Sequence, residues 1–284
     1  MGRQIMFDDI YSPLYERLPD SGAYLERIGM PPVANVDKET LDHLVLAHQT
    51  SVPFENLDIY DAGRELSLGV RDLYEKIVTR RRGGYCFELN GAFMALLKSL
   101  GYECYAVAAR VIQNRTGTMP LSHRGAIVTI GGDRYFCDVG FGGPSGQSAL
   151  ALDEPGAQPS GPNTFIIERD ERGTVINRLN GSNKEPILLF WETPVDEVDF
   201  LALNEYSSKN KNSIFTQWRA CNLVTETGSI TLNGNVLRIH SSGNTVEKTL
   251  NSSDELRAAL KEYYGIQVDF PLKGFDENPQ PAES

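Results

Sequence analysis

The sequence predicts an α+β protein in which a helical N-terminal third precedes a long run of antiparallel strands. Up to about residue 101, apolar residues recur at intervals of three and four, which is the period of an amphipathic helix. From residue 102 onward, short runs rich in Ala, Val and Ile alternate between apolar and polar residues, which is typical of strands. The 284 residues are enough for two or three small domains and for a large buried core.

Four helices are expected in the helical third. Asp37 is a predicted N-cap for the second helix, Pro53 ends that helix, and Gly83-Gly84 separates the third helix from the fourth. The four predicted helices span residues 18–28, 38–51, 70–82 and 86–101.

The strands of the middle third indicate antiparallel pairing, consistent with a small barrel. Gly131-Gly132-Asp133 is a predicted turn that joins residues 124–130 and 134–139 into a hairpin. Residues 151–162 are rich in Pro, Gly and Ser and are expected to form a loop. Asn233-Gly234-Asn235 predicts another tight turn. The other predicted strands are residues 102–111, 165–167, 175–179, 187–191, 217–224, 229–232, 236–240 and 245–250, with two later helices at 195–206 and 252–264.

The composition excludes several classes of function. A net charge of −11 argues against nucleic-acid binding and against binding to an anionic membrane surface, since both need basic residues. The sequence has no run of about 18 apolar residues, as a membrane span would need, and no secretory signal at its start.

Cysteine usage points to an intracellular protein without a structural metal. The four cysteines are too far apart for a zinc-type pair and too few for a disulfide framework. We therefore expect reduced thiols, no metal site and a cytoplasmic location. The cysteines are Cys86, Cys104, Cys137 and Cys221.

Cys86 is a candidate nucleophile because it is predicted to begin a helix two residues after the glycine pair Gly83-Gly84. The unpaired N–H groups at a helix N-terminus carry partial positive charge, which favours a reactive thiolate. Cys86 shares one helical stripe with Asn90, Phe93 and Leu97, so its side chain is expected to point inward. The alternative is a buried structural cysteine, which behaves as a small hydrophobe.

A cysteine nucleophile needs a base and a group that orients the base. His123 is the candidate base among four histidines because it opens a strand, where a side chain can face a cleft. Asp138 lies between apolar strand residues, where a carboxylate needs a partner. In the predicted hairpin the two residues lie near one end and can hydrogen-bond, which leaves the second imidazole nitrogen for Cys86. The alternative is a turn histidine and a capping aspartate that are unrelated.

Residues 82–90, with the sequence Arg-Gly-Gly-Tyr-Cys-Phe-Glu-Leu-Asn, resemble the RGGxCxExN signature of the arylamine N-acetyltransferases. Further motifs follow the order found in that family and extend the resemblance over nearly the whole chain. These motifs are residues 24–29, 52–57, 122–123 and 138–142, with Asn204, Tyr206, Ser213 and Phe215 resembling a later substrate-side segment.

The resemblance implies a three-part fold around a core like that of cysteine proteases and transglutaminases. It implies a helical bundle that carries the nucleophile, a β-barrel that carries the His and Asp, and an α/β lid, while the polar, Pro-rich tail that follows is expected from its composition to be disordered. The corresponding ranges are residues 1–101, 102–193, 194–275 and 276–284.

The resemblance also implies roles for individual residues. By position, Cys86 is the nucleophile, His123 the base and Asp138 the orienting group. Three aromatic residues would line the acceptor or acyl pocket, with ordinary core packing as the alternative; these are Phe54, Phe141 and Tyr206. Two charged residues, Arg82 and Glu88, would form structural ion pairs near the site.

The implied reaction is a two-step (ping-pong) transfer of an acetyl group from acetyl-CoA, through Cys86, to an aromatic amine or hydrazine. Acetyl-CoA would be a cosubstrate, and no cofactor would be bound permanently. The alternatives are a macrolactam-forming amide synthase of the same family, a cysteine hydrolase of the protease or transglutaminase type, and an inactive scaffold. A monomer and a homodimer both remain open.

Two features of the sequence bear on the substrates. Residues 124–126, Arg-Gly-Ala, are smaller than the family often has, so the width of the pocket is expected to differ. No residues are assigned to bind the phosphates of CoA. The candidates are the basic runs at residues 80–82 and 209–211 and the Gly-rich segment 140–143, but the runs are explained equally well as solvated charge and the segment as a plain turn.

Overall fold

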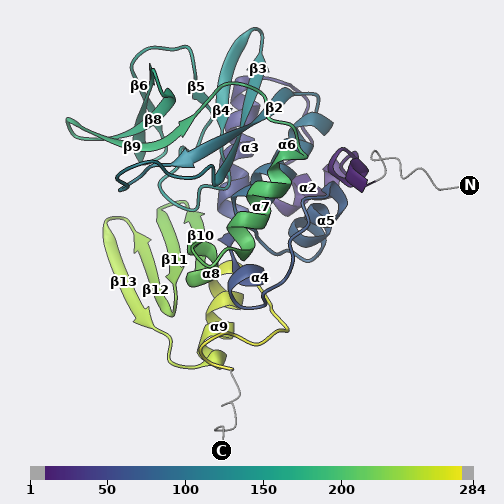
Figure 1. The fold of residues 1–284 in the computed structure, drawn as a ribbon, viewed down its shortest axis with the longest axis vertical. Helices are drawn as coiled ribbons and strands as arrows, with labels where there is room; N and C mark the ends of the chain where they lie inside the picture. Colours follow the sequence, from purple (N-terminus) through teal and green to yellow (C-terminus); the bar gives the residue numbers. More distant parts are fainter. Residues whose placement is uncertain (1–9, 277–284) are drawn as a thin grey trace, which may run out of the picture.

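Helices occupy the N-terminal part of the chain and strands the middle part, which confirms the predicted α+β class (Figure 1). The computed structural model describes residues 10–276. The expectations for the start of the chain and for the tail beyond residue 276 therefore lie outside the described residues.

Four of the helices in the N-terminal part follow the predicted pattern, with one interruption. Asp37 caps α3 as predicted, because its side chain accepts a hydrogen bond from the backbone N–H of Thr40 at 2.8 Å. The predicted helix 70–82 is instead two pieces, α5 followed by the π-helical turn η2. The short α4 was missed because four residues are too few to show a period. The elements are η1 (Ser12–Leu14), α2 (Ser21–Arg27), α3 (Lys38–Ser51), α4 (Leu57–Tyr60), α5 (Val70–Tyr74), η2 (Glu75–Thr79) and α6 (Cys86–Ser99).

An antiparallel sheet of eight strands follows, in the order β5-β4-β3-β2-β9-β8-β7-β6. The predicted hairpin is present: β3 pairs with β4, and Ile130 lies opposite Asp133 across the turn. The strands are β2 (Glu103–Val111), β3 (His123–Ile130), β4 (Asp133–Cys137), β5 (Leu150–Ala151), β6 (Ala157–Ser160), β7 (Asn163–Asp170), β8 (Gly173–Asn180) and β9 (Asn183–Phe190).

The prediction that residues 151–162 form only a loop was wrong, because β6 lies within them. The Gln158 side chain accepts a hydrogen bond from the N–H of Ala151 and donates one to its carbonyl oxygen, both at 2.8 Å. Because β5 and β6 are the two ends of the sheet, these bonds help to curl it into a nearly closed barrel.

A second sheet joins distant parts of the chain, in the order β1-β10-β11-β12-β13. The predicted helix 195–206 lies slightly later, and the predicted strand 217–224 begins late because α8 precedes it. Since β1 comes from the helical third, the boundaries expected for bundle, barrel and lid stay a prediction. The elements are β1 (Phe54–Glu55), α7 (Asp199–Lys209), α8 (Ile214–Gln217), β10 (Ala220–Thr225), β11 (Gly228–Asn233), β12 (Val236–Ser241), β13 (Asn244–Thr249) and α9 (Ser253–Tyr264).

Helix α6 lies in the centre of the main hydrophobic core. Eleven of its fourteen residues are buried, because it packs against the helices α2, α3 and α5 and against the strands β2 and β3. Two further clusters of buried side chains fill the inside of the barrel and the space between the second sheet and α9. The residue at the start of α6 is therefore held by the packing of the whole helix.

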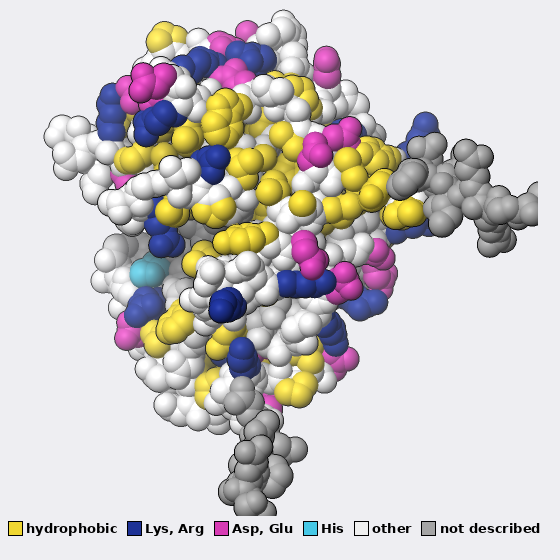
Figure 2. Space-filling model, in the orientation of Figure 1, with side chains coloured by type: hydrophobic (Ala, Val, Ile, Leu, Met, Phe, Trp, Pro, Cys, Tyr) yellow, Lys and Arg dark blue, Asp and Glu magenta, His cyan; other side chains and the backbone are white. Residues whose placement is uncertain are grey.

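The surface carries both signs of charge. Figure 2 shows acidic and basic side chains interspersed on the face it draws, with hydrophobic side chains gathered in its upper half, over the barrel and the neighbouring helices. Within residues 10–276, no helix combines the length and the apolar character that crossing a membrane would require.

Candidate active site

Cys86 is the first residue of α6 and is buried, so its side chain points inward as predicted. The two preceding glycines allow its backbone to pass close to other segments. A Cβ on Gly83 would lie 1.9 Å from the carbonyl oxygen of Pro53, and one on Gly84 would lie 2.9 Å from the Cβ of Glu88. Any larger residue would push the start of α6 away from the segment at residue 53.

Buried ion pairs fix the chain around this helix start. Glu88 accepts a hydrogen bond from the N–H of Tyr85 at 3.1 Å and pairs with Lys76 at 2.7 Å. Arg82 donates two hydrogen bonds to Glu55, at 2.7 and 3.0 Å. Burial acts to lower the pKa of Lys76, but the neighbouring carboxylates, first of all Glu88, raise it overall. The expectation that Arg82 and Glu88 form ion pairs near Cys86 is confirmed.

His123 and Asp138 meet at one end of the β3–β4 hairpin. His123 begins β3 and Asp138 directly follows β4, and the Nε2 atom of His123 lies 2.7 Å from the Oδ2 atom of Asp138. The side chain of Cys86 also interacts with the imidazole, and its thiol donates a hydrogen bond to the carbonyl oxygen of Ser122, the residue before His123, at 3.5 Å. Because Asp138 holds Nε2, the nitrogen left for the thiol is Nδ1. The structure therefore brings the three predicted residues into one connected cluster, here called the Cys86 cluster.

The protonation of His123 suits a thiolate partner. Burial acts to lower the pKa of His123, but the charge and hydrogen bond of Asp138, followed by those of Cys86, raise it to about 10. The imidazole is therefore protonated at neutral pH, and an imidazolium is the partner that a cysteine nucleophile needs. Burial raises the pKa of the thiols of Cys104, Cys137 and Cys221, to about 11 for Cys104.

Three residues without a predicted role hold Asp138. Asn90 donates from Nδ2 to the Oδ1 atom of Asp138 at 2.9 Å and accepts from the N–H of Val139 at 2.9 Å. The N–H of Gly140 donates to the same Oδ1 atom at 2.9 Å, and Gln49 donates to the carbonyl oxygen of Asp138 at 2.9 Å. Asn90 follows the cysteine by one helical turn, which was the available signal in the sequence. For Gln49, which lies on another helix, the sequence held no signal of a contact with Asp138.

A cavity of about 660 Å³ lies beside the Cys86 cluster. Cys86 and His123 line it together with all three predicted pocket residues, Phe54, Phe141 and Tyr206. The rings of His123 and Phe141 meet edge to face, with centroids 5.7 Å apart. The wall of aromatic side chains suits a flat aromatic ligand.

The cavity also has lining residues that the sequence did not indicate. They come from the segment between β2 and β3 and from the region of α8 and β10. A polar loop has no periodicity, so neither its course nor its neighbours can be predicted from sequence. The principal ones are Gln113, Arg115, Met119, Ile214, Trp218 and Asn222.

Residues 124–126 do not line this cavity, so the expectation that they alter its width was wrong. Side chains alternate along a strand, and Arg124 therefore points to the opposite face of β3 from His123. There it is buried, pairs with Glu197 at 2.8 Å and lies 4.6 Å from the centre of the Phe200 ring.

Of the segments considered for the phosphates of CoA, only residues 140–143 border the cavity. In the basic runs, Arg80 pairs with Glu75 and Lys209 with Glu205, each at 3.1 Å. Between residues 10 and 276, no group of three His, Cys, Asp or Glu side chains is arranged to hold a metal ion.

Comparisons with known proteins extend over most of the chain. The N-acetyltransferase family model matches residues 37–273. The chain is 32% identical to the arylamine N-acetyltransferase of Mycolicibacterium smegmatis, over 93% of this chain and 98% of that protein.

The fold of this chain is also similar to the folds of solved structures. The arylamine N-acetyltransferase of M. tuberculosis is 30% identical and superposes with a TM-score of 0.82, covering 87% of this chain and 94% of that one. The Mycobacterium marinum arylamine N-acetyltransferase, solved in complex with CoA, is 28% identical, with a TM-score of 0.81 and coverage of 87% and 93%.

Proposed function

Because the chain belongs to the arylamine N-acetyltransferase family, we propose that it transfers an acetyl group from acetyl-CoA, through Cys86, to an aromatic amine or hydrazine. Family membership makes the protein an acyltransferase. The acetyl donor is supported by the CoA complex of the M. marinum relative. The roles of the individual residues rest on the geometry of the Cys86 cluster.

The observation that carries the proposal is the position of this cluster at the buried wall of a large cavity lined by aromatic side chains. A thiol in contact with a protonated imidazole, which is itself held by a carboxylate, is the arrangement that nucleophilic catalysis by cysteine requires. A merely structural cysteine has no need of such partners.

In the first half of the reaction, the Cys86 thiolate attacks the carbonyl carbon of the thioester. The bond between that carbon and the sulfur of CoA breaks, and His123 gives its Nδ1 proton to the departing thiol. Acetyl-Cys86 and a neutral imidazole remain. The unpaired N–H groups in the first turn of α6 stabilise the oxyanion during the attack.

In the second half, the aromatic amine attacks acetyl-Cys86. Such amines are largely unprotonated at neutral pH, so the nitrogen lone pair is available. His123 takes the proton that the amine nitrogen loses, the amide leaves, and Cys86 returns as a thiolate beside an imidazolium. Asp138 keeps its hydrogen bond to Nε2 throughout and so fixes the orientation of the ring.

The decisive experiment combines an activity assay with mass spectrometry. Incubation with acetyl-CoA alone should add the mass of one acetyl group to Cys86, and later addition of an arylamine should remove it and yield the amide. Cys86→Ala should lose both signals, whereas Cys104→Ala, which changes a thiol outside the cavity, should keep them.

Retained turnover in Cys86→Ala would contradict the proposal. Release of acetate at a rate independent of the amine would indicate a hydrolase instead. As part of the same proposal we place the protein in the cytoplasm, because all four cysteines are unpaired thiols, as a reducing compartment favours.

A further inference from the structure

The cavity runs from a buried end to an exposed end. Cys86 and His123 are each 2% exposed, whereas Tyr206, Ile214 and Trp218 are 40%, 56% and 60% exposed. On the face drawn in Figure 2, the surface is hollowed where the barrel faces the second sheet. Large hydrophobic side chains that stay exposed around one cavity are characteristic of a binding surface.

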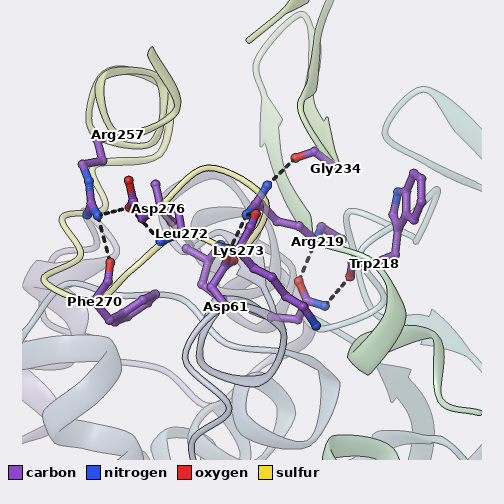
Figure 3. Close-up of polar contacts among 12 residues, drawn as sticks. Asp61, Trp218, Arg219, Gly234, Arg257, Phe270, Leu272, Lys273 and Asp276 are labelled. Atoms are coloured by element: carbon purple, nitrogen blue, oxygen red, sulfur yellow. Dashed lines mark hydrogen bonds and ion pairs between the residues drawn. The ribbon is translucent and has the colours of Figure 1, made fainter. Parts of the chain in front are cut away.

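Trp218 combines a fixed backbone with a free ring. Its carbonyl oxygen accepts a hydrogen bond from Nδ2 of Asn56 at 2.7 Å, and the next residue, Arg219, is held in a buried ion pair with Asp61. Figure 3 shows the indole of Trp218 pointing away from this polar cluster. A Cβ on Gly234 would lie 3.5 Å from the ring, so the turn between β11 and β12 supports the indole at its edge. The indole is thus an aromatic plane that loses little freedom when a ligand stacks on it.

The cavity is lined by basic rather than acidic side chains, although the chain as a whole is acidic. The whole sequence has a net charge of −11, yet no Asp or Glu is among the described residues that line the cavity. Arg115, on the segment between β2 and β3, is exposed and lines the cavity. Its backbone N–H bonds to Ile112, but its guanidinium has no ion-pair partner within residues 10–276. The exposed part of the cavity therefore favours an anionic ligand.

We propose that Trp218 and Arg115 bind the nucleotide end of CoA, with the adenine stacked on the indole and a phosphate paired with the guanidinium. This inference rests on the proposed function, because it names the residues that hold the acetyl donor. An aromatic plane selects a base by stacking, and an arginine selects phosphate through paired hydrogen bonds. CoA fits the course of the cavity, since its thioester must reach Cys86 at the buried end while its charged nucleotide stays in contact with water.

The aromatic amine belongs at the other end. An uncharged amine gains nothing from Arg115, and it must reach the acetyl group on Cys86. The aromatic wall next to Cys86, which includes the buried Phe54 and the half-buried Phe141, supplies the contacts for such a ring. The two ends of the cavity therefore recognise different substrates.

A binding experiment tests the inference without any acetyl transfer. The probe is adenosine 3′,5′-bisphosphate, which is the nucleotide end of CoA without its thiol arm. The chain has two tryptophans, and Trp191 lies outside the cavity, so Trp191→Phe leaves Trp218 as the fluorescent indole. We expect saturable quenching of its fluorescence, and binding about tenfold weaker when Arg115→Gln is added.

The matched control for the charge is Arg172→Gln, which removes an exposed arginine on the β7–β8 turn and should not change the affinity. Absence of quenching would overturn the stacking of adenine on Trp218. Equal affinities with and without Arg115→Gln would overturn the role of Arg115.

A kinetic experiment separates this inference from the proposed function. S-acetylpantetheine has the same thioester as acetyl-CoA but lacks the nucleotide. We expect Trp218→Ala to lower the ratio of kcat/KM for acetyl-CoA to kcat/KM for S-acetylpantetheine by about tenfold, since stacking is lost only for acetyl-CoA. Trp191→Ala, the matched control, should leave the ratio unchanged. An unchanged ratio in Trp218→Ala overturns the inference alone, whereas absence of acetyl transfer in the unmodified protein overturns the proposed function.

Discussion

Each member of the Cys86 cluster is buried, so water cannot replace a lost partner. Both oxygens of the Asp138 carboxylate are occupied: Oδ2 by His123, and Oδ1 by Asn90 and Gly140. At this scale the chemistry of a single residue depends on its neighbours, and two single substitutions test that dependence.

Replacing Asp138 by Asn should change how stability depends on pH. The pKa of His123 is about 10 in the folded protein and 6.5 ordinarily, so the shift contributes its full stability below about pH 6.5 and loses it as the pH rises toward 10. In the variant, burial acts against the charge without Asp138 to offset it. The test is the free energy of unfolding in urea, measured for both proteins at pH 6.5 and at about pH 9.5. The wild type should be the more stable protein at pH 6.5, and this difference in stability should shrink at the higher pH, because each unit by which Asp138 raises the pKa of His123 corresponds to roughly 1.4 kcal/mol. An advantage of equal size at both pH values would show that His123 is not held protonated.

Replacing Asn90 by Ala should destabilise the protein and slow the reaction. The change leaves the buried N–H of Val139 and the buried carbonyl oxygen of Arg124 without their partner. An unpaired buried group costs about 1–3 kcal/mol, so we expect a loss of about 2–4 kcal/mol in urea unfolding. The control is Asn180→Ala, at the exposed end of β8, which should change stability by less than about 0.5 kcal/mol.

At the scale of elements, α6 is positioned as a unit by contacts at its N-terminus. The backbone of Cys86 lies against Gly140, where a Cβ would be 2.9 Å from the Cα of Cys86 and 2.9 Å from Nδ2 of Asn90. The loop after β4 and the first turn of α6 can therefore approach each other only because Gly140 has no side chain. This contact sets the distance between Cys86 and the loop that carries Asp138.

Gly140→Ala should separate these two elements. We expect a loss of about 100-fold in kcat/KM, because a displacement of 1 Å at a reacting centre has an effect of that order. Stability should fall by about 1–3 kcal/mol through overpacking. Gly22→Ala is the matched control, since its nearest neighbour is the flexible end of Asp20 at 3.2 Å, and it should keep wild-type activity. Equal activities for the two variants would show that the contact does not position Cys86.

At the scale of the whole molecule, a buried ion pair connects three parts of the chain. Arg219 pairs with Asp61 beside α4, and both groups also hold Lys273: Arg219 donates to its carbonyl oxygen and Asp61 accepts from its N–H, each at 2.8 Å (Figure 3). In the same view Arg257 pairs with Asp276 at 2.8 Å. These contacts hold the segment after α9 against the helical part and fix the backbone next to Trp218.

Arg219→Met should destabilise the protein by about 3–5 kcal/mol, because it leaves the Asp61 carboxylate buried and uncompensated. Adding Asp61→Asn should restore part of this loss, which a double-mutant cycle on urea unfolding will measure. The control pair is Arg172 with Asp170, whose exposed ion pair is worth about 0–1 kcal/mol. Additive effects of the two substitutions at residues 61 and 219 would show that the pair contributes no coupling.

Features that depend on neighbours in the sequence were predictable. The cap at Asp37, the helix beginning at Cys86 and the turn between β3 and β4 all follow from residues within a few positions of one another. The hairpin was enough to place His123 and Asp138 at the same end of a strand pair. One error is also local: the short strand at residues 157–160, which pairs with β7, was hidden in a Pro- and Gly-rich segment.

By itself, the sequence determined the fold class and singled out Cys86, His123 and Asp138, because periodicity, turn residues and ordered motifs are properties of the linear chain. The tertiary structure decided what surrounds them. The support of Asp138 by Gln49, the direction of Arg124 and the meeting of Arg115 with Trp218 at one cavity join residues tens of positions apart. Such contacts depend on how whole elements pack against one another, which local patterns do not specify.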